Sequence, residues 1–234
     1  MRTKIIKNAK EDLPLYFNDF KIFWDASVIA ITDEDLYKTY RATLVFKNWK
    51  ISLKTINIKE FDLLLDELFE DINASFFLAL YGQYRSAHMH MRSSIELTLQ
   101  LLYFIHHPIE YQQWKEGKFV IKFDKLQEYL NKHPNFNVDI SGLLQNVFQN
   151  WKHFSKHIHG ESPIFFQCEK DIRKTNSFSK KDFGVWKSNF EKNTYYLNKL
   201  LLLFFKNDFN RIPEASRNIL TDLLKEDEKD IMNA

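Results

Sequence analysis

The middle of the chain carries three polar side chains that a helix would place on one face. The apolar periodicity of residues 142–158 predicts that helix, and Lys152, Ser155 and His159 follow one another along it at steps of three and four residues. A cation, a hydroxyl and an imidazole on one face can bind a phosphate and move a proton. A second interpretation is structural: Ser155 packs between helices, and a protonated His159 complements the negative end of the helix dipole. The spacing alone leaves both interpretations open.

An upstream helix, predicted over residues 83–106, supplies a second polar strip. Arg85, Arg92 and Glu96 share one of its faces, beside an apolar stripe. The Arg92–Glu96 pair is either an exposed helix ion pair or a buried one that fixes how two helices are oriented. Antiparallel packing of the two helices would set their polar strips side by side. We therefore predict one site that combines Arg92, Glu96, Ser155 and His159, with Arg85 beside it.

Metal and cysteine chemistry have little support in the sequence. Among the eight histidines, His153 and His157 are four residues apart, but no carboxylate follows at a matching step. The single cysteine, Cys168, excludes an intramolecular disulfide framework and any multi-cysteine metal site. We expect neither a metal nor another cofactor.

The elements that must position these residues are helices. Glycine and proline together supply ten of 234 residues, which is too few for a many-stranded β fold, and the glycines are too scattered for a GxGxxG or Walker loop. We predict an all-α helical bundle that forms a single domain over residues 1–234. Mostly helical segments are expected over residues 13–106, 139–159 and 181–224, with a break at Tyr81-Gly82 and a short hairpin arm within Glu161 to Ser179. A last helix is expected to open at Pro213 and fray over residues 225–230.

Charge and hydropathy bear on partners and location. The net charge is +2, but residues 150–206 carry eleven Lys and Arg against five Asp and Glu. Such a basic stretch with aromatic residues between its charges either follows a phosphate backbone or is a solvated face. The first residues lack the apolar core of a signal peptide, and no apolar run is long enough to span a bilayer. We expect a cytoplasmic protein without a membrane partner.

The aromatic content predicts self-association. Aromatic residues make up 16% of the chain, and 22 of its residues are phenylalanine. One helical domain is expected to leave part of this apolar surface exposed, and exposed apolar patches usually mark interfaces. We therefore predict a homodimer.

Two stretches resemble HEPN-like helical proteins of bacteria. One runs from Tyr81 to Leu97 and reads YGQYRSAHMHMRSSIEL; the other runs from Trp151 to Gly160 and reads WKHFSKHIHG. The resemblance implies a bundle core over about residues 58–206, with extra N- and C-terminal helices, and a dimer. It also implies metal-independent RNA cleavage by an Arg-x4–6-His motif, in toxin–antitoxin, antiphage or stress systems.

The match to that motif is partial. The histidine of the motif corresponds to His159, but Phe154, His153 and Lys152 occupy the positions where its arginine is expected. Lys152 keeps a cation but lacks the bidentate fork of arginine. Arg92 or Arg85 from the neighbouring helix then supplies the missing guanidinium. Ser155 completes the implied catalytic set, and Glu96 and His157 support it.

Three function hypotheses follow. The first is an endoribonuclease or RNA-binding component of phage defence or of a toxin–antitoxin or stress system. The second is a non-catalytic interaction subunit, antitoxin-like, with a partner protein from the same operon. The third is a nucleotide sensor with a pocket between the Arg92–Glu96 face and the Ser155–His159 face. A shared polar cleft favours the first and third, whereas a buried ion network favours the second.

If the chain cleaves RNA, His159→Ala should abolish cleavage and leave the fold intact, because loss of a general acid–base group lowers rates by about 10² to 10⁴. Lys152→Ala should weaken cleavage, whereas Lys152→Arg should retain it by restoring a planar phosphate fork. The measurement is degradation of total RNA with and without a chelator. Equal, intact RNA with wild type and His159→Ala would contradict the nuclease hypothesis.

Overall fold

The computed structural model describes residues 7, 10, 11, 21, 22, 24–136, 141–159 and 178–233. Across these ranges the chain forms helices and turns, and no strand occurs, which confirms the predicted all-α helical bundle. Gly160, Cys168 and nearly all of the expected hairpin arm lie outside the described residues. Within the described ranges, the segments predicted to be helical are mostly helical.

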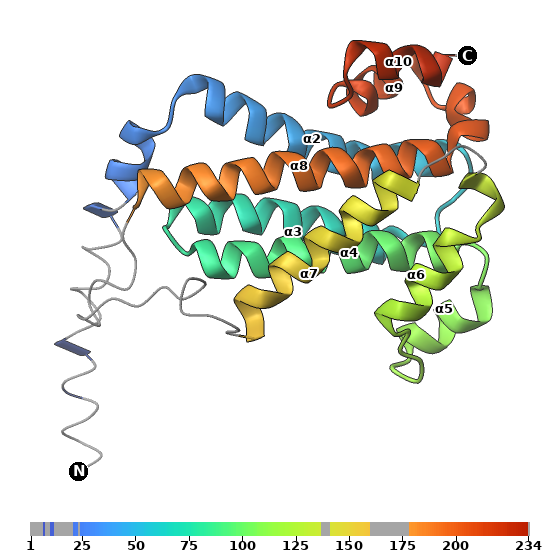
Figure 1. The fold of residues 1–234 in the computed structure, drawn as a ribbon, viewed down its shortest axis with the longest axis horizontal. Helices are drawn as coiled ribbons and strands as arrows, with labels where there is room; N and C mark the ends of the chain where they lie inside the picture. Colours follow the sequence, from blue (N-terminus) through green and yellow to red (C-terminus); the bar gives the residue numbers. More distant parts are fainter. Residues whose placement is uncertain are drawn as a thin grey trace.

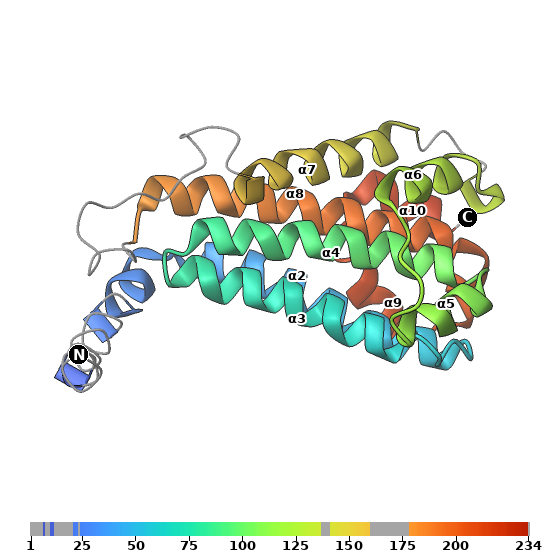
Figure 2. The ribbon, with the colours of Figure 1, turned by 90° about the horizontal axis from the view of Figure 1, so that it is seen from below.

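Four long helices run side by side and form the body of the bundle (Figure 1). They are α2 (Asp33–Thr55), α3 (Asp62–Leu80), α4 (Tyr84–Phe104) and α8 (Lys180–Phe204). A fifth long helix, α7 (Ser141–His159), packs obliquely across α4 and α8, as Figure 2 shows from a second direction. The shorter elements gather at one end of the bundle: α5 (Pro108–Lys115), α6 (Phe123–Asn131), the 3₁₀ turns η1 (Pro134–Phe136) and η4 (Lys206–Arg211), α9 (Glu214–Thr221) and α10 (Glu226–Asn233).

Local sequence signals set the ends of these helices. The Thr32 hydroxyl accepts a hydrogen bond from the Asp35 amide and caps α2, and Ser179 caps α8 in the same way. The predicted break at Tyr81-Gly82 is confirmed. Gly82 has a φ of 67°, and the Gln83 amide donates to the Leu78 carbonyl at 2.8 Å, so the chain reverses in a Schellman-type turn.

The C-terminal end differs from the prediction. We expected one last helix that frays over residues 225–230, but these residues begin a separate helix, α10. Its Glu228 carboxylate lies 2.5 Å from the Lys199 ammonium of α8 and also accepts a hydrogen bond from the Tyr195 hydroxyl. This partly buried ion pair gives the charged segment a tertiary anchor that its composition alone does not reveal.

Buried apolar side chains form one core cluster that draws on every long helix, with Trp49, Phe104, Phe154 and Trp186 among its largest members. Polar ties cross this core. The Trp49 indole donates to the Asn198 amide oxygen at 2.8 Å, and the Asn198 amide nitrogen donates to the Leu220 carbonyl at 2.7 Å. One fully buried asparagine on α8 therefore fixes both α2 and α9. No helix in the described part of the chain is both long and apolar enough to cross a membrane.

Asn198→Leu should destabilise the fold although it keeps the side-chain volume nearly constant. The substitution leaves the buried Trp49 N–H without its acceptor, which costs about 1–3 kcal/mol. Urea unfolding of Asn198→Leu, Trp49→Phe and the double variant measures the coupling between the two residues. If the losses in free energy of unfolding of the two single variants add up to that of the double variant, the hydrogen bond between Trp49 and Asn198 is contradicted.

Candidate functional site

The predicted polar strips of α4 and α7 meet in a compact hydrogen-bonded seam. Arg92 Nε donates to Ser155 Oγ at 3.0 Å, and its Nη2 lies 2.8 Å from Glu96 Oε1. The Trp151 indole donates to the same Glu96 oxygen at 2.8 Å. Ser155 is 7% exposed, and its hydroxyl donates back to the Trp151 carbonyl. The convergence of Arg92, Glu96 and Ser155 is therefore confirmed, and Trp151 joins them.

Aromatic contacts extend this seam to α6. The Arg92 guanidinium lies over the Trp151 ring, 5.0 Å from its centroid, in a cation–π contact. The other neighbour of that indole is Phe123, the first residue of α6, whose ring stacks on it at 3.8 Å and 10°. The seam thus joins three helices, and Arg92 has partners along both its edge and its face.

Arg85, the other arginine of the strip, holds the end of α7. Its Nε donates to the His157 carbonyl at 2.7 Å, and its Nη2 donates to the Ile158 carbonyl at 3.1 Å. The last carbonyls of a helix lack partners within the helix and carry its negative dipole end, so a guanidinium there is favourable. Arg85 caps this helix from a neighbouring one.

The two remaining predicted catalytic residues lie apart from the seam. Lys152 and His159 are exposed on the outer edge of α7, in line with the exposed Lys156, and among the described residues neither forms a hydrogen bond or ion pair with Arg92, Glu96 or Ser155. The helix therefore turns Ser155 inward while it turns the lysine and the histidine toward solvent. What the structure assembles is an arginine–carboxylate–serine seam, in which the serine hydroxyl bonds Arg92 and the Trp151 carbonyl.

Histidines cluster on the inner side of α7 instead. The His88 ring of α4 stacks on the His157 ring at 4.1 Å and 7°, and His153 lies edge-on to His157. His88 Nδ1 donates to the Tyr84 carbonyl at 2.6 Å, and the Asn189 amide donates to Nε2, which fits a neutral ring protonated on Nδ1. Burial, with the neighbouring His157, lowers the pKa of His88 to about 3, and burial with His153 and Arg85 lowers the pKa of His157 to about 4. Both rings are neutral at neutral pH, so His157 supplies no positive charge for a phosphate.

Within the described ranges, no three His, Cys, Asp or Glu side chains gather in a group that could hold a metal ion.

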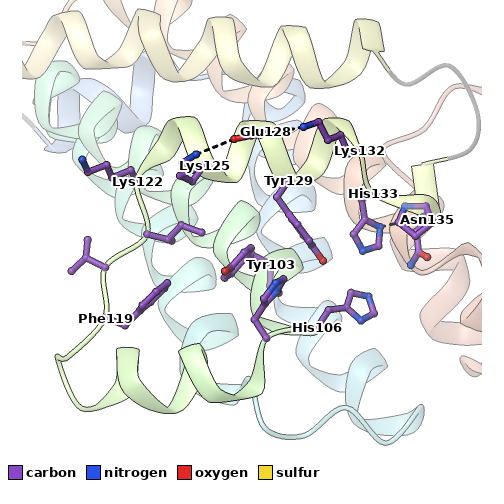
Figure 3. Close-up of a pocket in the computed structure, with 14 residues that line it drawn as sticks. Tyr103, His106, Phe119, Lys122, Lys125, Glu128, Tyr129, Lys132, His133 and Asn135 are labelled. Atoms are coloured by element: carbon purple, nitrogen blue, oxygen red, sulfur yellow. Dashed lines mark hydrogen bonds and ion pairs between the residues drawn. The ribbon is translucent and has the colours of Figure 1, made fainter.

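A pocket of about 930 Å³, which was not predicted from the sequence, lies at the other end of α4 (Figure 3). Its wall is aromatic. The Tyr103 and His107 rings stack at 3.8 Å, and the Tyr129 ring of α6 stands edge-on to both. Phe119, from the connection between α5 and α6, closes one side. This volume lies in the range of small-molecule sites.

The rim of the pocket is basic. Lys122, Lys125 and Lys132 line it with one carboxylate, Glu128, a net charge of +2 with neutral histidines. Glu128 holds Lys125 and Lys132 at 3.1 Å each, through one oxygen apiece. Both pairs are exposed, so they contribute little to stability and the ammonium groups can turn to another anion. Lys122 makes no ion pair with the described residues.

A buried histidine adds a directional donor to this pocket. His133 Nδ1 accepts the Asn135 amide at 3.1 Å, and burial, followed by His106 and His107, lowers the pKa of His133. A neutral ring that accepts at Nδ1 carries its proton on Nε2. His133 therefore offers an N–H to a ligand without the cost of a buried charge.

A sequence signal for the pocket does exist. Lysines at 118, 122, 125 and 132 are interleaved with Phe119, Phe123 and Tyr129, which is the basic–aromatic pattern of nucleic-acid surfaces.

Comparison of the chain with protein-family models, curated proteins and solved structures finds no match.

Acidification should destabilise the protein before most carboxylates titrate. In the folded protein the pKa values of His88 and His157 lie below the usual value of 6.5. Between the folded and unfolded pKa values, the unfolded chain therefore binds more protons than the folded chain, and acidification favours unfolding. Stability should be full above about pH 6.5 and fall by up to about 1.4 kcal/mol per pH unit per histidine as pH decreases toward the folded values. Urea unfolding between about pH 7 and pH 5 measures the slope, which should be shallower in His88→Gln. Identical slopes for the two proteins would contradict a buried neutral His88.

Proposed function

We propose that this protein binds a nucleotide unit, a base with its phosphate, in the pocket between α4 and α6, either as a free nucleotide or at the end of an RNA strand. The observation that carries the proposal is one 930 Å³ pocket with an aromatic wall and three lysines on its rim. The HEPN-like seam then holds helices together and shapes this pocket. In a phage-defence or toxin–antitoxin setting, such a protein recognises RNA or a nucleotide signal.

The wall suits a base. Tyr103, Tyr129 and Phe119 are half-buried, so part of each ring remains accessible in the pocket. Base–aromatic stacking contributes about 1–3 kcal/mol per base and accepts any base. The Nε2 proton of His133 adds a donor for a base acceptor or a phosphate oxygen.

The rim suits a phosphate. Lys125 and Lys132 lie one on each side of Glu128 (Figure 3). Lys125 and Glu128 belong to α6, and Lys122 and Lys132 flank that helix at its start and its end. Lysine binds phosphate as a point charge and does not need the planar geometry of arginine. Three ammonium groups around one mouth favour a dianionic group over a neutral ligand.

The contacts within the seam favour a role in helix packing over RNA cleavage by the seam residues. Ser155 donates to a backbone carbonyl, Arg92 is engaged by Ser155, Glu96 and Trp151, and Arg85 caps α7. A nucleophile needs a base within hydrogen-bond reach, and the serine hydroxyl instead bonds the Arg92 guanidinium and the Trp151 carbonyl. These groups serve helix packing.

RNA cleavage at the end of α7 is the second candidate function. Lys152, Lys156 and His159 are exposed along one edge of the helix, where they can meet a phosphate backbone. This edge lies outside the α4–α6 pocket, so the two candidates respond to different substitutions.

Titration calorimetry with AMP, and with a short RNA carrying a 5′ phosphate, tests the proposal. Wild type should bind at least one of them, and Tyr129→Leu should weaken binding by about 5- to 150-fold through lost stacking. Lys125→Gln with Lys132→Gln should weaken binding and flatten its salt dependence, because fewer ions are displaced. Tighter binding of the RNA than of AMP identifies a strand end, and the reverse order identifies a free nucleotide.

Lys38→Gln is the matched control, because Lys38 also forms an exposed i,i+4 ion pair, with Glu34 on α2, outside the pocket. It should bind like wild type. The proposal fails if neither ligand binds at millimolar concentration, or if the pocket variants bind as well as the control. RNA that is degraded by wild type and spared by His159→Ala would favour the second candidate.

A further inference from the structure

The outer edge of α2 exposes a row of apolar side chains. Tyr37, Tyr40, Leu44 and Ile51 are 57%, 56%, 43% and 52% exposed. With Lys47 they follow one another at alternating steps of three and four residues, so they form one straight strip along the helix. A monomer rarely exposes a continuous apolar strip of this kind, and such strips mark interfaces. We name these five residues the α2 strip.

The charges at the two ends of the strip differ in sign. Asp33 and Glu34 are exposed at the start of α2, whereas Lys47 and Lys54 are exposed near its end. The helix has 23 residues and is about 35 Å long. Parallel alignment of two copies would set like charges side by side at both ends, whereas antiparallel alignment sets each acidic end beside a basic end.

A groove extends the surface on one side of the strip. About 470 Å³ of space lies between α2 and α9, lined by Leu44, Lys47 and Ile51 of the strip and by Ile219 of α9, which is 41% exposed. In Figure 1, α2 runs along the outer edge of the bundle, and α9 lies at its C-terminal end. A second helix laid along the strip can place large side chains into this groove.

We propose that a second copy of this chain packs on the α2 strip, with the two α2 helices antiparallel across a two-fold axis. An isologous interface needs a surface that complements itself, and a helix with an apolar middle and ends of opposite charge does so in antiparallel alignment alone. The antiparallel dipoles of the two helices favour the same alignment. The interface lies outside the residues of the seam and of the α4–α6 pocket.

Sedimentation velocity of the full chain over a micromolar concentration series tests this interface. Wild type should shift reversibly from the 28.2 kDa monomer toward twice that mass. Leu44→Asp should weaken association by about tenfold or more, because it places a charge among the apolar residues of the α2 strip. Ile109→Asp is the matched control, since Ile109 is an exposed apolar residue of α5, and it should associate like wild type.

Charge reversal tests the antiparallel alignment. Neither Asp33 nor Lys47 forms an ion pair with the described residues, so their reversal disturbs little within one chain. Lys47→Glu alone should weaken association, and adding Asp33→Lys to the same chain should restore it. The second-copy proposal is overturned if wild type stays monomeric throughout the series, in which case another protein covers the strip, or if Leu44→Asp associates like wild type. Failure of the double reversal to restore association would overturn the antiparallel alignment.

Discussion

The guanidinium of Arg92 organises the half of the molecule in which α4, α6 and α7 meet. It pairs with Glu96 on its own helix, bonds Ser155 on α7 and lies over Trp151. Because Ser155 is buried, a lost partner would leave polar groups inside the helix interface without compensation. This side chain and the cap that Arg85 places on the helix end hold α7 against α4, beside the apolar residues that α7 buries in the core, such as Val147 and Phe154.

The pocket inherits its shape from the same contact. Trp151, held by Glu96, stacks on Phe123, and Phe123 begins α6, the helix that carries Lys125, Glu128 and Tyr129 and is followed directly by Lys132. The orientation of α6 over the aromatic end of α4 therefore depends on the contact of Phe123 with Trp151, which lies outside the pocket. If the pocket binds a nucleotide as proposed, the residues that resemble a catalytic motif support that site from outside it, and substitutions in the seam and in the pocket would both affect ligand binding.

Helical periodicity and the scarcity of glycine and proline were enough to predict the bundle and the break at Tyr81-Gly82. Thr32, Ser179 and Tyr81-Gly82 act within a few residues of themselves, so their effects can be read from the sequence. The meeting of Arg92 and Glu96 with Ser155 was also predictable, because the pattern of a helix fixes which residues share a strip. The solvent-facing position of His159 was not, since Ser155 and His159 lie only about 40° apart around the helix and the tilt of α7 decides which of them is buried. The α4–α6 pocket depends on how four short segments pack at one end of the bundle, and periodicity says nothing about that. The HEPN-like relationship itself remains a prediction.

At the mouth of the pocket, the Glu128 carboxylate already occupies the place between two lysines that the phosphate of the proposed ligand would take. Its two oxygens hold Lys125 and Lys132 apart, one ammonium group each. A phosphodiester carries one negative charge, as that carboxylate does, so exchanging one for the other gives almost no net gain in electrostatic energy. A terminal phosphate carries up to two charges above its second pKa of about 6, and only this extra charge is a net electrostatic gain. If the pocket binds a nucleotide as proposed, the carboxylate would make it discriminate by ligand charge, against the interior of a nucleic-acid strand and in favour of a molecule that ends in phosphate.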